Sequence, residues 1–148
     1  MNIKRPYWLA AALLCLGLGA AVAAQEPAPA KQQTRHRIVV AITSGDEADW
    51  HLTTGNLRHL IETFPDAEIE VVAYGPGLSM VLKTTSTVAQ EIQDLAAKHV
   101  RFVGCENSMR ARHVTAADLL AGIGTVPSGI VEVVTKQEQG WTYTKAGR

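Results

Sequence analysis

After residue 35 the sequence alternates short β-branched runs with longer amphipathic segments, and this alternation constrains the fold most. Apolar residues recur at three- and four-residue spacing between the runs, as helices require. Strands joined by helices of this length form a mainly parallel sheet. The fold class expected is therefore α/β, with about five strands and helices on both faces of the sheet. The expected strands are 37–43, 69–74, 100–103, 125–126 and 141–144.

Three helix starts can be predicted from local signals. Thr87 and Gln90 have the spacing of a capping box, in which each side chain bonds the other residue's backbone N–H. Thr115 resembles a second start, leading into a helix that continues to Ile123. Pro127 suits the first turn of a third helix. The face of this last helix expected to point inward comprises Ile130, Val133, Val134 and Gln137.

The N-terminal segment differs in kind from the rest. Lys4 and Arg5 precede an apolar run of about 14 residues, and small residues with an A-x-A pattern follow it. We therefore interpret residues 1–24 as a secretory signal peptide, 25–34 as a flexible leader and 35–148 as one domain. The predicted location is the periplasm, with no membrane attachment after cleavage. The run is short for a membrane span, which needs about 20 apolar residues, but an uncleaved anchor is the alternative.

Cysteine usage narrows the chemistry. The chain has two cysteines, Cys15 and Cys105, and the first lies within the predicted signal peptide. A single remaining cysteine cannot form an internal disulfide. Cys105 is then a buried packing residue, a partner in an intermolecular disulfide, or a free reactive thiol.

The distribution of charges and histidines argues against nucleic-acid binding and against a metal site. The predicted mature chain has a formal charge of −2 because Lys4 and Arg5 are removed with the signal. Its basic residues do not cluster, so nucleic acid is not an expected partner. His51 and His59 would lie about 12 Å apart along one helix, too far to share a metal ion. We expect neither a metal nor a cofactor.

Candidate site residues lie in loops that follow the expected strands, where open α/β sheets bind ligands. Cys105 lies between a strand end and a helix start, where backbone N–H groups favour a thiolate and increase its reactivity. It is the candidate reactive residue. The candidate binding residues from the same loops are Ser44, Gly75, Gly77, Asn107 and Ser108.

The order of these motifs resembles the DsrE/DsrF-like family. The resemblance spans roughly residues 38–145. The segments that carry it are Asp49-Trp50, Asn56-Leu57, Glu70–Leu78, Phe102–Met109, Val126–Glu132 and Gln139–Tyr143. It implies a three-layer α/β/α sandwich and a homo-oligomer, often a trimer or hexamer. In the sulfur-relay members a cysteine carries sulfur as a persulfide between a donor and an acceptor protein.

The function expected is a periplasmic thiol protein of the sulfur-relay type, with Cys105 as candidate persulfide carrier. Whether such a carrier turns over as a transferase stays open. Two alternatives also stay open. One is a non-enzymatic oligomeric module that binds a small ligand or partner, in which Cys105 is structural. The other is a redox sensor that uses oxidation of Cys105.

Overall fold

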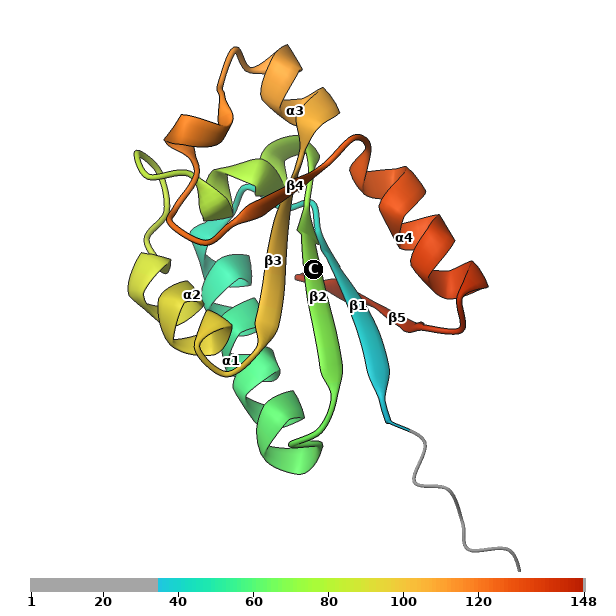
Figure 1. The fold of residues 1–148 in the computed structure, drawn as a ribbon. Helices are drawn as coiled ribbons and strands as arrows, with labels where there is room; N and C mark the ends of the chain where they lie inside the picture. Colours follow the sequence, from blue (N-terminus) through green and yellow to red (C-terminus); the bar gives the residue numbers. More distant parts are fainter. Residues whose placement is uncertain (1–34, 148) are drawn as a thin grey trace, which may run out of the picture. The chain divides into compact units, whose positions relative to one another are not determined.

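Five parallel strands form a single sheet in the computed structural model, which describes residues 35–147. Their order is β4-β3-β2-β1-β5, and Figure 1 shows the sheet between its helices. The strands are β1 (Arg37–Ile42), β2 (Glu68–Ala73), β3 (Val100–Cys105), β4 (Gly124–Val126) and β5 (Thr142–Ala146). The predicted signal peptide and leader lie outside the described residues.

Helical segments connect every pair of consecutive strands. They are α1 (Glu47–Thr63), η1 (Gly75–Val81), α2 (Ala89–Ala96), α3 (Glu106–Ala111), η2 (Ala116–Asp118) and α4 (Gly129–Glu138), where η denotes a 3₁₀ helix. The predicted α/β class with a five-stranded parallel sheet is confirmed. Among residues 35–147, no helix is both long and apolar enough to cross a membrane.

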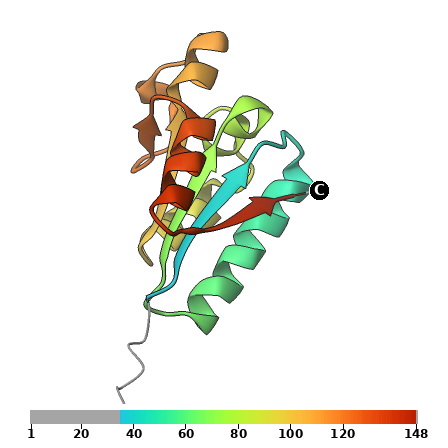
Figure 2. The same ribbon diagram turned by 90° about the vertical axis from the view of Figure 1, so that its right-hand side faces the viewer.

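The path of the chain decides which face each helix covers. From β1 to β4 the strands are added in one direction, and α1 and α2 cover the same face. The connection from β4 to β5 returns past three strands to the far side of β1. Because parallel crossovers are right-handed, this reversal places α4 on the opposite face, as Figures 1 and 2 show.

Alternate strand residues supply two separate cores. On the α1 side the sheet contributes Ile38, Val40, Ile42 and Val71, together with many helix residues, to a large apolar cluster. On the α4 side the cluster is small. Its buried members are Val39, Ala41, Val72, Val103, Val126 and Val133. The buried apolar cluster on the α4 side of the sheet is therefore much smaller than the one on the α1 side.

Two of the helix starts predicted from the sequence differ from those in the structure. The Thr87–Gln90 capping box is wrong, since α2 begins at Ala89 without a side-chain cap. Val88 is buried at that point, and the Gln90 side chain bonds Asp94 instead of reaching back. Thr115 does form a capping box, with Asp118, but the helix ends after one 3₁₀ turn at Asp118.

The predicted inward face of the last helix is also wrong. Ile130 and Val134 are 55% and 45% exposed, and of the predicted face only Val133 is buried. The side of α4 that contacts the sheet starts at Gly129. Pro127 precedes the helix instead of occupying its first turn.

Candidate functional site

The carboxyl ends of the strands bring Cys105 into a junction of four chain segments. Cys105 is the last residue of β3 and the N-cap of α3. It is in register with Val126 of β4, after which the chain enters α4 at Gly129. On its other side β2 ends at Ala73, which is paired with Gly104, and Tyr74 follows. Figure 1 shows β3 leading into α3 at this edge of the sheet.

The Cys105 side chain is a free thiol that is 4% exposed. Burial alone would raise the pKa of this thiol, because it disfavours the charged form. Hydrogen bonds from the Ser108 hydroxyl and from the backbone N–H groups of Gly129, Ser108 and Asn107 stabilise the thiolate. Together they bring the pKa of Cys105 below its ordinary value. The site is therefore suited to hold a thiolate, which is the nucleophilic form of cysteine.

Ser108 has a defined orientation in this arrangement. Its Oγ accepts a hydrogen bond of 2.8 Å from the backbone N–H of Gly75. Gly75 has a positive φ of 56°, a conformation that glycine adopts without strain. With an oxygen lone pair engaged by Gly75, the hydroxyl hydrogen is available to the sulfur of Cys105. The loop after β2 thus orients a donor that belongs to α3.

Tyr74 closes the site from the α4 side. A Cβ added to Gly129 would lie 2.7 Å from the Tyr74 Cβ, so the first turn of α4 packs directly on this residue. Burial, followed by the proximity of Tyr143 and Cys105, raises the pKa of the Tyr74 phenol. Tyr74 therefore stays neutral at physiological pH and is an uncharged neighbour of Cys105.

A cleft of about 580 Å³ opens beside the thiol. Gly75, Asn107 and Ser108, three of the candidate binding residues, line it. The other lining residues are Gly45, Pro76, Ser79, Ala111 and Arg112. Ser108 belongs both to the cleft and to the set of donors around Cys105. The cleft therefore reaches the immediate surroundings of the sulfur, although Cys105 itself is not among its lining residues.

The remaining two candidate binding residues have structural contacts. Ser44 accepts the backbone N–H of Asp46 on its Oγ, and its carbonyl accepts the indole N–H of Trp50. Gly77 is buried, and a Cβ there would lie 2.2 Å from the carbonyl oxygen of Ile42. Neither residue lines the cleft. They shape the loops that carry Gly45 and Gly75.

Charges near the cleft are arranged unevenly. Arg112 is its one charged lining residue, and its guanidinium donates to the Ser79 hydroxyl at 2.8 Å. Arg110 is paired with the side-chain oxygen of Asn107. The carboxylate of Glu106 accepts a 2.8 Å hydrogen bond from Thr125. With no acidic residue in its lining, the cleft suits a neutral or anionic ligand better than a cation.

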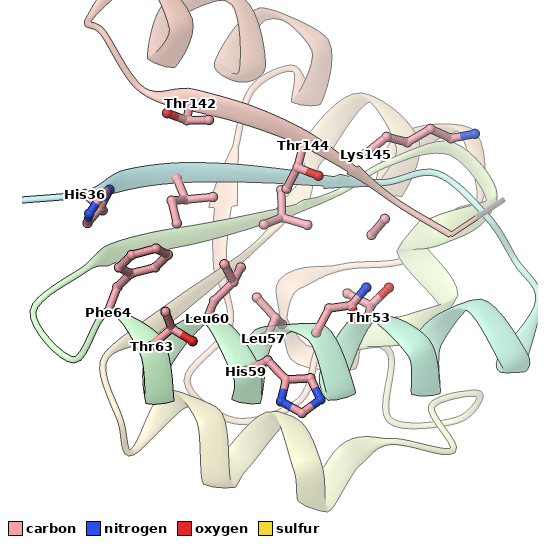
Figure 3. Close-up of a pocket in the computed structure, with 14 residues that line it drawn as sticks. His36, Thr53, Leu57, His59, Leu60, Thr63, Phe64, Thr142, Thr144 and Lys145 are labelled. Atoms are coloured by element: carbon pink, nitrogen blue, oxygen red, sulfur yellow. The ribbon is translucent and has the colours of Figure 1, made fainter.

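A second cavity, of about 500 Å³, lies between α1 and the β1–β5 part of the sheet (Figure 3). It shares no lining residue with the cleft near Cys105. Its floor is apolar, with Ile38, Val40 and Leu57, and His36 and Phe64 stack at one end. No cluster of three or more His, Cys, Asp or Glu side chains suited to a metal ion occurs within residues 35–147.

Sequence reasoning missed two residues of the thiol site, Gly129 and Tyr74. Gly129 begins a helix that follows the end of a strand after two intervening residues, which is close to the signal that singled out Cys105. The same signal could have identified it. Tyr74 follows β2 at the carboxyl edge of the sheet, but its contact with Gly129 depends on where α4 crosses. No local pattern encodes that crossing.

A comparison with protein families matches residues 36–145 to the DsrE/DsrF-like family. The chain belongs to the DsrE/DsrF-like family. Among solved structures, this DsrE/DsrF-like protein is similar to a protein of unknown function from Methanobacterium thermoautotrophicum. The two share 34% identity with a TM-score of 0.71, over 74% of this chain and 98% of the other. No curated protein matches it significantly.

Two more distant structures share the fold. One is a protein of unknown function from Bacteroides thetaiotaomicron, at 14% identity and a TM-score of 0.62, covering 74% of this chain and 93% of the other. The second is the ychN protein from E. coli, at 14% identity and a TM-score of 0.61, covering 75% and 98%. Family membership suggests a sulfur-relay-like protein, and the buried thiol with its donors is the part of the fold that bears on such a role.

Proposed function

We propose that this DsrE/DsrF-like protein carries sulfur as a persulfide on Cys105. The observation that carries the proposal is the set of donors around one buried sulfur. One hydroxyl and three backbone N–H groups stabilise the thiolate despite its burial. A cysteine that only packs requires no such donors. Stabilising the anion favours attack on an electrophilic sulfur near neutral pH.

The transfer needs no external oxidant. The Cys105 thiolate attacks the outer sulfur of a sulfane-sulfur donor and forms a new S–S bond. The donor's own bond to that sulfur breaks, and its remaining part leaves with the electron pair. The resulting persulfide anion is held by the same N–H donors. An acceptor thiolate then attacks the outer sulfur, and Cys105 leaves as the thiolate with which the cycle began.

The cleft next to Ser108 supplies the route of approach in this proposal. Its walls contribute the amide of Asn107, the hydroxyl of Ser79 and the guanidinium of Arg112. These groups donate hydrogen bonds to a negatively charged donor molecule or to an acidic segment of a partner protein. The expected partners are a sulfur donor protein and a sulfur acceptor protein.

Direct detection of the persulfide tests the proposal. Anaerobic incubation with a sulfane-sulfur donor should add about 32 Da to the Cys105 peptide, and dithiothreitol should remove it. The variant Cys105→Ser should show no adduct, and Ser108→Ala should load more slowly. If the wild-type protein gains no sulfur under conditions in which its thiol can still be alkylated, the carrier function is refuted.

The 4% exposure of Cys105 favours a second candidate, an oligomeric binding module in which the cysteine is structural. In that case the cleft binds a small ligand or partner and no sulfur is transferred. Alkylation that occurs only after unfolding would support this candidate. So would a Cys105→Ser variant that retains the ligand or partner binding of the wild type.

We further propose that the chain is exported to the periplasm and assembles with copies of itself. The support for export is the predicted signal peptide at residues 1–24. The support for assembly is an apolar surface on the α4 side, formed by Ile130, Val131, Val134 and Tyr143. N-terminal sequencing of the protein from a periplasmic fraction tests the first. Light scattering of the wild type and of Val131→Glu tests the second, and a monomeric wild type would refute it.

A further inference from the structure

A buried ion pair joins α4 to the sheet at the end of the helix remote from Cys105. Glu70, on β2, is 1% exposed, and its Oε2 lies 3.0 Å from the Lys136 Nζ and 3.1 Å from an Arg101 Nη. Lys136 is also 3.6 Å from a Glu132 carboxylate oxygen and 4.2 Å from the Trp141 ring centre. The Lys136 ammonium thus has three partners, namely Glu70, Glu132 and the Trp141 ring.

This ion pair is poorly suited to a purely stabilising role. The Glu70 Oε1 is buried without a hydrogen-bond partner among the described residues. Burial, with a smaller effect of the neighbouring Glu132 side chain, raises the pKa of the Glu70 carboxyl, and Lys136 and Arg101 oppose the rise. Replacing buried ion pairs by apolar residues is often neutral or stabilising, whereas fixing position is a known use of such pairs. The unsatisfied Glu70 Oε1 therefore indicates that the pair serves to fix the position of α4 rather than to stabilise the fold.

The contacts of α4 with the sheet side lie along one stripe of the helix. Gly129 packs on Tyr74, Val133 is buried in the small core, and Lys136 bonds Glu70. These positions are four and three residues apart, so they lie on the same face. The apolar part of this stripe is small. Since Gly129 and Val133 are the buried residues of α4, the ion pair of Lys136 is a large part of what fixes this helix on the sheet.

We propose that Lys136 and Glu70 are positioning residues for the thiol site. They hold α4 in the place where the backbone N–H of Gly129 meets the Cys105 sulfur and the first turn covers it. The ion pair acts over seven residues of helix, about 10 Å. It touches neither the sulfur nor the cleft. The inference rests on the proposed function for its role in sulfur transfer, but the positioning itself is measurable without a sulfur donor.

The test is the pH profile of alkylation of Cys105, followed on its own peptide by mass spectrometry. In Lys136→Met the labelling midpoint should move to higher pH, with an about five- to tenfold lower acid dissociation constant of the thiol for the partial loss of one charge-assisted bond. The plateau at high pH should rise, because α4 no longer covers the sulfur. Lys136→Arg, which keeps the charge and donors, should restore most of the midpoint.

Arg58→Met is the matched control. It removes an ion pair of similar length, with Glu91, that connects α1 to α2 on the other face of the sheet. It should leave the midpoint unchanged even if it lowers stability. If Lys136→Met does not fold, Glu70→Gln replaces it, because the amide keeps the volume and loses the charge. The expected change then has the same direction and is smaller.

The outcomes separate this inference from the proposed function. A wild-type midpoint in Lys136→Met and Glu70→Gln would overturn the positioning role, even if persulfide forms on Cys105. A shifted midpoint in a protein that never accepts sulfur would support the positioning role and refute the carrier function. A shift of equal size in Arg58→Met would also overturn the inference, because general loosening of the fold would then explain it.

Discussion

Replacing Ser108 by alanine tests the thiol site most directly. The hydroxyl has two bonds, accepting the N–H of Gly75 at 2.8 Å and donating to the Cys105 sulfur. Alanine removes both while keeping the residue helical. The thiolate then loses its one side-chain donor and retains the backbone donors. We expect the pKa of Cys105 to rise and the unfolding free energy to fall.

The size of each effect follows from the kind of bond lost. A hydrogen bond to a charged group contributes about 1.5–3 kcal/mol. Because 1.36 kcal/mol corresponds to about a tenfold change in equilibrium, the acid dissociation constant of the thiol should fall at least about tenfold, which raises the labelling midpoint by about one pH unit or more. The Gly75 N–H loses its acceptor in a half-buried position. This loss should lower the unfolding free energy by about 1 kcal/mol, the low end of the range for an unsatisfied donor.

The assay is the rate of iodoacetamide labelling of Cys105 as a function of pH, combined with urea unfolding. The midpoint of the labelling profile should move to higher pH in Ser108→Ala. Ser79→Ala is the matched control, since Ser79 lines the same cleft and bonds Arg112 but is not among the donors to the sulfur. Ser108→Thr keeps the hydroxyl and should resemble the wild type.

One result would refute the reasoning. If Ser108→Ala loses stability but its labelling midpoint equals that of the wild type, Ser108 only fastens the loop after β2. The low pKa of the thiol would then have to come from the backbone N–H groups alone. An equal shift in Ser79→Ala would likewise show that the change comes from the cleft in general.

Four further predictions concern stability. Gly77→Ala should lower the unfolding free energy by about 3 kcal/mol in urea titrations, because its Cβ would lie 2.2 Å from a backbone oxygen; Gly55→Ala, with open space around it, should instead stabilise α1 by about 0.5–1 kcal/mol. The pKa of Cys105 is lower in the folded state than in the unfolded state. Ionisation of the thiol therefore stabilises the fold at pH values above the unfolded pKa of about 8.5. This stabilisation is lost as the pH falls through the folded pKa. The stability advantage of the wild type over Cys105→Ser should accordingly grow as the pH rises toward about 8.5 and level off above it, and a constant difference would contradict the assignment. The pKa of Glu91 is lowered, because hydrogen bonds from Thr54 and nearby positive charges outweigh its burial, so Glu91→Gln should lose less stability on acidification below about pH 4 than the wild type does.

How far the sequence determined the fold depends on the range of the interactions involved. The β-branched runs and the apolar spacing of α1 are set by neighbours within one or two turns, so the strands and their parallel arrangement could be predicted. The capping box at Thr87 failed because the burial of Val88 in the core outweighed a local exchange of hydrogen bonds. The prediction of the inward face of α4 failed because the helix turns Gly129, Val133 and Lys136 toward the sheet, where Lys136 meets the buried Glu70, and leaves its most apolar stripe exposed.

The residues of the thiol site also fall into two groups, those related by local sequence and those that the fold brings together. The sequence by itself identified Cys105 between a strand and a helix, and Asn107 and Ser108 as its neighbours, since these relations lie within four residues. Only the tertiary structure decided that Gly75 orients Ser108 and that Gly129 and Tyr74 lie next to Cys105. These contacts depend on where β4 lies in the sheet and on the return of α4 across the opposite face, which no segment of the chain specifies alone. The physical reason is that a parallel sheet gathers strand ends from distant parts of the chain at one edge.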